Sequence, residues 1–267
     1  MNRFLKGAMI LTIAGVIVKI IGAFSKVLVA RILGGEGIGL YMMAYPIYQI
    51  IVSISAAGIP VAISIMIAEK LANRDMRGVQ QVFNVSLRVL TLVGIIFSVG
   101  LYASAEWLIK WNIITDSRAL IPIQLLSPAI IVVTILSCFR GYFQGFQYMV
   151  PTGTSQVFEQ IFRVGSMVGL AYYFIDSGLH LAAGGATFAT FPGVLAGLIV
   201  LVYFYRSQRS LRQQMLSEQN EEAPIERTSA VIKRLFALAI PVSMANIMLP
   251  MVSLIDTFIV PKRLMDI

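Results

Sequence analysis

The fold of this chain is constrained above all by a series of apolar runs, each about as long as a helix that crosses a bilayer. A spanning helix needs about 20 mostly apolar residues, and the chain is 58% hydrophobic with 13% charged residues. Closed barrels also span membranes, but their strands alternate polar and apolar side chains, whereas these runs are continuously apolar. The sequence therefore predicts an all-α, polytopic transmembrane helical bundle. Its predicted helices cover residues 7–30, 38–69, 80–103, 119–139, 154–175, 181–205 and 235–260.

One polar stretch, residues 206–232, divides the predicted bundle. Six predicted helices precede it, within residues 1–205, and one follows it, within residues 233–267. RFLKGAM at Arg3 and KRLFALA at Lys233 open apolar runs in a similar way, as parallel repeats of a transporter would. We therefore expect a six-helix lobe, a cytoplasmic linker and the first helix of a second, incomplete lobe. The alternative is that any two amphipathic helix starts look alike.

Positive charge is distributed unevenly between the loops on the two sides of the predicted bundle. Short cytoplasmic loops are enriched in Lys and Arg. The N-terminal side holds Arg3, Lys6, Lys70, Arg74, Arg77, Arg140, Arg206, Arg209, Arg212, Arg227, Lys233 and Arg234, and the other side holds Arg31, Lys110, Arg118, Lys262 and Arg263. We therefore expect a multi-pass protein with a cytoplasmic N-terminus, whose net charge of +8 favours contact with anionic membrane lipids over nucleic acid.

Four cations interrupt the predicted helices: Lys19, Lys26, Arg88 and Arg163. A Lys or Arg at the centre of a spanning helix costs about 2.5 to 3.5 kcal/mol, so such residues usually face a bundle interior or a water-filled cavity. Several of them around one cavity would bind an anion. We expect these four to form a cationic, substrate-binding cavity.

Helical spacing places polar partners beside these cations. Lys19 and Lys26 share a face of the first predicted helix with Gly22. Glu159 and Arg163 are four residues apart, which favours an ion pair within one helix. The expected supporting polar residues are Asn84, Gln156, Glu159 and Gln160.

Three of the four cations also have a simpler explanation, whereas Lys19 lies near the middle of its helix. Lys26 lies near enough to its helix end to reach the interface. Arg88 could act as a gate or extend to the headgroups, and Arg163 could serve mainly to neutralise Glu159. Asp256, in the seventh predicted helix, is a candidate for ion coupling or for an interface between lobes.

Backbone breakers in two predicted helices suggest motion. Gly58 and Pro60 lie in the second predicted helix, and Pro192 and Gly193 lie in the sixth. Such residues bend or unwind membrane helices where neighbours satisfy the freed carbonyls. We expect hinges for alternation between inward-facing and outward-facing states, with static kinks as the alternative.

Several segments resemble one known family. They are FRGYFQGFQYMVPTGTSQVFEQIFRVG at Phe139, KIIGAFSKVLVARILGGEGIGLY at Lys19 and AAGIPVAIS at Ala56. These segments are similar to the stage V sporulation protein B group, which belongs with the lipid II flippases to the MATE-like multidrug, oligosaccharidyl-lipid and polysaccharide exporter superfamily. The resemblance spans essentially the whole chain. It implies a protein of two lobes, in which this chain is the N-terminal portion and the C-terminal lobe is its missing partner.

The resemblance also implies a function. It is that of a bacterial plasma-membrane flippase, which moves an undecaprenyl-pyrophosphate-linked cell-wall precursor or polysaccharide outward by alternating access. The anionic, lipid-linked glycan would be held by the four intramembrane cations. One departure from the lipid II flippases is that residues 41–68 contain no basic residue, so the substrate could differ or the anion contacts could lie on other helices.

Two other functions remain open. A cation-coupled multidrug exporter requires buried carboxylates, of which the chain offers chiefly Glu159. A truncated lobe without independent transport is the other. The sequence has no nucleophile and base pair, phosphate-binding loop or metal-ligand cluster, and its single cysteine, Cys138, allows no internal disulfide. We therefore expect no enzyme activity, cofactor, metal or nucleic-acid partner.

Overall fold

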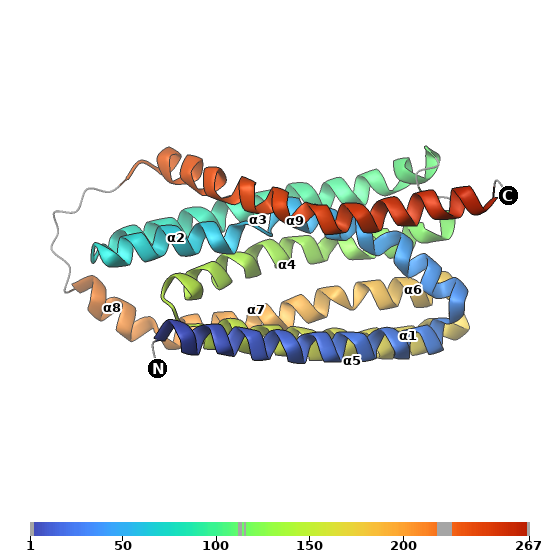
Figure 1. Ribbon diagram of the computed structural model, residues 1–267, viewed down its shortest axis with the longest axis horizontal. Coiled ribbons are helices and arrows are strands. Elements are labelled where there is room, and N and C mark those ends of the chain that lie inside the picture. Colours follow the sequence, from blue (N-terminus) through green and yellow to red (C-terminus); the bar gives the residue numbers. More distant parts are fainter. Residues whose placement is uncertain (1–2, 112–113, 115, 218–225, 266–267) are drawn as a thin grey trace.

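The chain forms a bundle of helices that lie along one another (Figure 1). The computed structural model describes residues 3–111, 114, 116–217 and 226–265, and their regular structure is entirely helical, which confirms the all-α prediction for this part of the chain. The helices are α1 (Arg3–Ser55), α2 (Ile59–Ala72), α3 (Met76–Lys110), α4 (Leu120–Gly145), α5 (Val150–Phe174), α6 (Leu179–Phe188), α7 (Thr190–Ser207), α8 (Arg209–Ser217) and α9 (Thr228–Met265). Two short 3-10 helices are η1 (Ser117–Ala119) and η2 (Ile175–Ser177).

Long apolar helical stretches make this a multi-pass membrane protein. Within the described ranges, the stretches long and apolar enough to cross a membrane are Leu5–Ala72, Met76–Lys110, Ser117–Gly145, Leu179–Ser207 and Thr228–Ser253. The first contains 68 residues, which is enough for more than one crossing at about 20 residues each. Helix α5 is not among these stretches. It is helical over the predicted range, but it carries the polar residues Glu159 and Arg163.

Helix α1 consists of two helices that meet at Gly34. The backbone there has φ 66° and ψ −175°, a conformation that is essentially limited to glycine. This break separates the helices predicted over 7–30 and 38–69, and the chain turns back after it (Figure 1). Gly34 therefore allows the chain to change direction between the first two predicted spans.

We expect Gly34→Ala to lower the free energy of unfolding by about 1–2 kcal/mol, because a Cβ at positive φ meets the following carbonyl. The matched control is Gly39→Ala. Gly39 lies in a regular part of α1, and a Cβ there would meet no atom within 4 Å. This control is expected to be neutral or stabilising. Denaturant titration in detergent micelles measures both, and equal stabilities for the two variants would contradict the role of Gly34.

Two helices predicted as continuous are interrupted. The predicted helix over 38–69 is broken at 56–58, and the predicted helix over 181–205 is broken at Ala189, between α6 and α7. Each break precedes a proline in the first turn of the next helix, Pro60 in α2 and Pro192 in α7. A proline is tolerated there because the first-turn N–H groups have no helical acceptor. The backbone breakers noted in the sequence at Gly58, Pro60 and Pro192 thus lie at or beside these interruptions, although each run was predicted as one helix.

The connections between helices gather at two ends of the bundle. The N-terminus, the α2–α3 and α4–α5 connections and α8 lie at one end, on the left in Figure 1, and the end of α9 lies at the other. At the first end, Lys70 Nζ lies 3.0 Å from Glu226 Oε1. At the second, Arg118 Nη1 lies 2.6 Å from Glu36 Oε1. The Arg118 guanidinium also donates to Asp116 and lowers the pKa of that carboxyl. The first end carries the loops that the sequence predicts to be cytoplasmic.

Helix α4 lies at the centre of the apolar core. Its first half, with Leu126 and Ile130, belongs to one buried cluster, and its second half, with Phe139 and Phe143, belongs to another. Helix α3 packs against α4 on one side, and α6 and α7 pack against it elsewhere. A charged side chain in this helix, Arg140, is therefore placed well inside the protein.

Candidate functional site

Three charged side chains meet between α4 and α5. Arg140 Nη2 donates to Glu159 Oε2 at 2.7 Å, and Arg163 Nη2 donates to the other carboxylate oxygen. Arg140 also lies 3.4 Å from the hydroxyl of Ser155. The side chains are mostly buried, with exposed fractions of 18% for Arg140, 14% for Glu159 and 22% for Arg163. We call Arg140, Glu159 and Arg163 the arginine cluster.

The predicted ion pair between Glu159 and Arg163 is confirmed, and glycines on α7 make room for it. A Cβ at Gly193 would lie 2.7 Å from Arg163 Cβ, and a Cβ at Gly197 would lie 3.2 Å from Glu159 Cβ. These two glycines therefore let the backbone of α7 approach α5 at the charged residues, as small residues do between membrane helices. Gly193, predicted as a hinge, is a contact position in this structure.

The arginine cluster carries a net positive charge, because two guanidinium groups share one carboxylate. The Nε atoms of Arg140 and Arg163 are both buried and have no hydrogen-bond partner among the described residues. Buried donors are normally satisfied. The cluster thus has an excess of positive charge to offer to an anion.

Three tyrosines from the second half of α1 lie near Arg163. Tyr41 and Tyr45 are stacked with ring centroids 5.3 Å apart, and Tyr45 and Tyr48 are 5.9 Å apart. All three lie within electrostatic range of the Arg163 guanidinium. Spacings of four and three residues put them on one helix face. They therefore present aromatic surface and hydroxyl groups on one face of α1, within electrostatic range of Arg163.

Lys19 and Lys26 lie exposed on the first half of α1, away from the face that packs on α5. That packed face includes Ala14, which would contact a Cβ at Gly153. A second face is exposed and strongly apolar, and it includes Ile20 and Phe24. Lys19 and Lys26 belong neither to the face that packs on α5 nor to the exposed apolar face.

A third face of α1 carries the lysines together with small residues. At helical spacing it holds Ala8, Thr12, Gly15, Lys19, Lys26 and Ala30, all of which are exposed or partly exposed. A face directed to lipid is expected to carry large apolar side chains, as the second face does, while intramembrane cations favour water. We call this third face of α1 the lysine face.

Gln160 links the helix of the lysines to the helix of the arginine cluster. Its side chain is buried, and a Cβ at Gly22 would lie 3.2 Å from Gln160 Nε2. The first half of α1 and α5 therefore run side by side (Figure 1). Gln156 is partly buried on α5. Among the described residues, no hydrogen bond or ion pair joins the lysines to the arginine cluster directly.

The structure does not bring Arg88 to the other predicted cations. Arg88 and Asn84 are exposed on α3, on a face that continues with the exposed apolar residues Leu92 and Val99. Helix α3 packs mainly against α4, α2 and α9, and not against α5. The headgroup explanation therefore accounts for Arg88 better than a cavity does. The side chain of Asp256 lies outside the described residues.

The predicted hinge residue Gly58 lies at a close contact with α9. A Cβ there would lie 2.1 Å from the carbonyl oxygen of Ala239, and the Gly58 N–H donates to Ser243 Oγ at 3.1 Å. Pro60 follows in the first turn of α2. The break at 56–58 is thus also one of the places where α9 contacts the rest of the bundle.

Arg140 and the three tyrosines were missed by the sequence reasoning. Arg140 was expected in a loop, because the predicted helix ended at residue 139, but α4 continues to Gly145. The usable signal was the FRGYFQG segment, whose apolar and aromatic residues continue the helical pattern past the charge. Cys138 is buried, and within the described ranges there is no group of residues that could hold a metal ion.

Comparison with known proteins gives a consistent result. A family model described as polysaccharide biosynthesis protein matches residues 4–266. Stage V sporulation protein B of Bacillus subtilis (strain 168) is 34% identical over 211 residues, which are 79% of this chain and 40% of that protein. Lipid II flippase MurJ of the same organism is 26% identical over 275 residues, which are 99% of this chain and 50% of that protein. The chain therefore spans about half the length of the curated relatives it matches.

A solved structure shares the fold. It is an inward-facing multidrug resistance MATE family transporter of the MOP superfamily, with a TM-score of 0.72 and 15% sequence identity. The alignment covers 88% of this chain and 51% of that one. At this identity the likeness concerns the arrangement of helices and not the substrate.

Proposed function

Because this chain belongs to the polysaccharide biosynthesis protein family, within the MATE-like exporter superfamily, we propose that it is one lobe of a flippase. The cargo is a lipid-linked glycan that bears a diphosphate, such as a cell-wall or polysaccharide precursor. The end of the bundle with the basic loops lies in the cytoplasm. A second lobe, corresponding to the remaining half of the relatives, completes the translocation path.

The observation that carries the proposal is the arginine cluster. Two guanidinium groups share one carboxylate in a mostly buried position, and both retain an unpartnered Nε–H. Guanidinium groups match phosphate oxygens in pairs of parallel hydrogen bonds. Glu159 compensates only one of the two guanidinium charges. A diphosphate that approaches the cluster is therefore attracted by the remaining positive charge.

The lysine face supplies the second part of the proposed site. Lys19 and Lys26 project from α1, which runs beside α5 through the contact of Gly22 with Gln160. Compact ammonium groups stabilise phosphate as point charges. In this proposal the headgroup lies between the lysine face and the second lobe, and it passes the arginine cluster as the lobes rock about the helix breaks at 56–58 and Ala189.

The physical task of such a protein is solvation rather than catalysis. A diphosphate and its sugars meet a large barrier in hydrocarbon, because water no longer satisfies their charge. A cationic chamber replaces that hydration, and the lipid tail stays in the bilayer. No covalent bond is made or broken.

A cation-coupled multidrug exporter is less well supported. Such a protein needs a carboxylate that is free to bind a cation or a proton. Glu159 is held by two guanidinium groups, so it is the least suitable kind of carboxylate for this purpose.

Removal of both lysines is expected to weaken binding of the cargo without affecting the fold. We expect Lys19→Gln combined with Lys26→Gln to raise the Kd for undecaprenyl diphosphate about tenfold, or about 1.4 kcal/mol. Both side chains are exposed, so stability should stay within about 0.5 kcal/mol. The control is Lys110→Gln at the exposed end of α3. A lipid-binding titration in nanodiscs measures these values, and an unchanged Kd in the lysine variant would remove the lysine face from the site.

Transport tests the function itself. The chain alone and the chain fused to the C-terminal half of Bacillus subtilis stage V sporulation protein B are reconstituted in liposomes with a labelled lipid-linked diphosphate glycan. We expect translocation above the lipid background for the fusion and none for the chain alone. Translocation by the chain alone would contradict the need for a second lobe, and a fusion that binds but does not move this lipid would contradict the cargo.

A further inference from the structure

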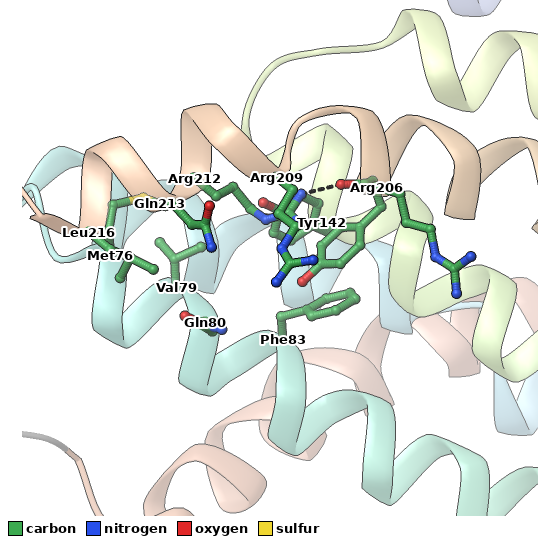
Figure 2. Close-up of a pocket in the computed structure, with 11 residues that line it drawn as sticks. Met76, Val79, Gln80, Phe83, Tyr142, Arg206, Arg209, Arg212, Gln213 and Leu216 are labelled. Atoms are coloured by element: carbon green, nitrogen blue, oxygen red, sulfur yellow. Dashed lines mark hydrogen bonds between the residues drawn. The ribbon is translucent and has the colours of Figure 1, made fainter.

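A cavity of about 430 Å³ lies between α3, α4 and the junction of α7 with α8 (Figure 2). It is at the end of the bundle that carries α8, and none of its lining residues belongs to the arginine cluster or the lysine face. The lining combines aromatic and aliphatic residues with three arginines, and it includes no carboxylate. A cavity with this composition favours a ligand that is anionic at one end and apolar at the other.

The apolar wall of the cavity is an aromatic cluster. Phe83 of α3 lies with its ring centroid 4.9 Å from that of Tyr142 of α4 and 5.0 Å from that of Tyr205 of α7. Tyr142 and Tyr205 are 5.3 Å apart. Val79 and Met76 extend this surface along α3. Three helices thus hold the wall in place, so that the apolar side of the cavity is preformed.

The basic rim comes from the end of α7 and from α8. The Arg212 guanidinium lies 3.7 Å from the centre of the Tyr205 ring and donates to the Tyr205 carbonyl oxygen. Figure 2 shows Arg209 reaching over Tyr142 and Phe83. Arg206 and Arg209 are exposed, and neither pairs with a carboxylate of the described part of the chain. The charge of the rim is therefore available to a ligand.

The position of α8 indicates where the ligand comes from. Helix α8 follows the apolar span Leu179–Ser207 after one residue, Gln208. It has basic residues on one side and apolar residues, including the exposed Leu211 and the partly buried Met215, on the other. A short amphipathic helix of this kind lies in the interface of a bilayer. Basic residues directly beside a membrane span attract anionic lipids.

We propose that this cavity binds an anionic phospholipid of the adjacent leaflet. The phosphate lies against Arg209, with Arg212 beside it, and the glycerol and the first part of the acyl chains lie against Phe83 and Tyr142. Arg206, whose side chain points away from these residues in Figure 2, adds positive charge at the end of α7. Bound lipid fixes α8 to the membrane surface. The site is separate from the proposed path of the glycan and does not depend on that function.

Lipid retention tests the proposal. The 267-residue chain is placed in nanodiscs of phosphatidylcholine with a minor fraction of phosphatidylglycerol, and native mass spectrometry counts the lipids that stay bound. We expect the wild type to retain phosphatidylglycerol above its share of the bilayer. Arg206→Gln combined with Arg209→Gln should reduce this retention about tenfold. Arg206→Lys with Arg209→Lys, which keeps the charge, should retain most of it.

The matched control removes two exposed cations at the same end of the bundle, Arg227→Gln and Lys233→Gln, and should leave retention unchanged. An equal loss in both double variants, or no preference for phosphatidylglycerol in the wild type, would overturn the proposal. Added inorganic phosphate separates the two possible sources of the anion. If phosphate displaces the lipid or binds equally well without it, the site is one for a soluble anion and the lipid assignment is wrong. The thermal unfolding midpoint of each variant shows whether it is folded.

Discussion

Glu159→Gln is expected to lower the free energy of unfolding by about 3–5 kcal/mol, the usual effect of removing one partner from a buried ion pair. The substitution keeps the size of the side chain but leaves Arg140 and Arg163 facing each other without a counter-charge. Neither guanidinium is more than 22% exposed, so water screens the repulsion poorly. Denaturant titration in detergent micelles measures the change.

The control for this prediction is the same substitution at an exposed pair. Glu36 and Arg118 have exposed fractions of 62% and 47%, so Glu36→Gln should cost no more than about 1 kcal/mol. Glu159→Asp keeps the charge and should be milder than Glu159→Gln. If Glu159→Gln and Glu36→Gln have the same small effect, the ion pairs of Glu159 with Arg140 and Arg163 do not behave as buried ion pairs.

Gly58→Val is expected to lower the free energy of unfolding by about 3 kcal/mol, at the upper end of the usual cost of overpacking. The new Cβ would lie 2.1 Å from the Ala239 carbonyl oxygen, which is backbone and part of a regular helix. Relief therefore requires α9 to move away, which also breaks the hydrogen bond from the Gly58 N–H to Ser243. The variant should unfold at lower denaturant concentration than the wild type.

Gly100→Val is the control for Gly58→Val. A Cβ at Gly100 would meet no atom within 4 Å, and the residue lies exposed on α3. This substitution should be close to neutral. Equal destabilisation by the two substitutions would mean that the effect comes from valine in a helix and not from the contact with α9.

The helices were predictable because apolar length is a local property. The predicted helix over 80–103 falls within α3, and the one over 119–139 falls within α4 except for residue 119, which belongs to η1. The predictions failed where a distant residue decides the outcome. Helix α4 extends past residue 139, and Arg140 meets Glu159 on another helix. No pattern near Arg140 reveals that partner.

The candidate site was predicted only in part, because some of its contacts lie within one helix and others join different helices. The pair of Glu159 and Arg163 follows from spacing within one helix, and the structure contains it. The membership of Arg140 and the separation of Arg88 depend on which helices pack together. Helix α8 was also missed. It is a short and mostly polar segment, although it contains Leu211 and Leu216, and it was interpreted as part of a linker. The sequence thus indicated which residues of one helix interact, but it did not indicate which helices pack together.

The two proposed anion sites are distinguishable by mutation. Arg206→Gln with Arg209→Gln should reduce retention of phosphatidylglycerol but leave the binding of undecaprenyl diphosphate within about twofold, a difference of about 0.4 kcal/mol. Lys19→Gln with Lys26→Gln should weaken the binding of undecaprenyl diphosphate but leave the retention of phosphatidylglycerol unchanged. A single variant that abolished both kinds of binding would mean that the two sites are not independent.

Whether the intramembrane cations hold a diphosphate headgroup is decided by comparing the affinities of the nanodisc-embedded chain for undecaprenyl diphosphate and for undecaprenol. The lipid tails are the same, so the difference reports the headgroup. We predict that the wild type prefers the diphosphate by about a hundredfold, or about 2.7 kcal/mol. Arg163→Gln with Lys19→Gln should lose most of that preference, while Arg74→Gln with Lys110→Gln should keep it. Equal affinities of the wild type for the two lipids would mean that these cations do not hold the headgroup.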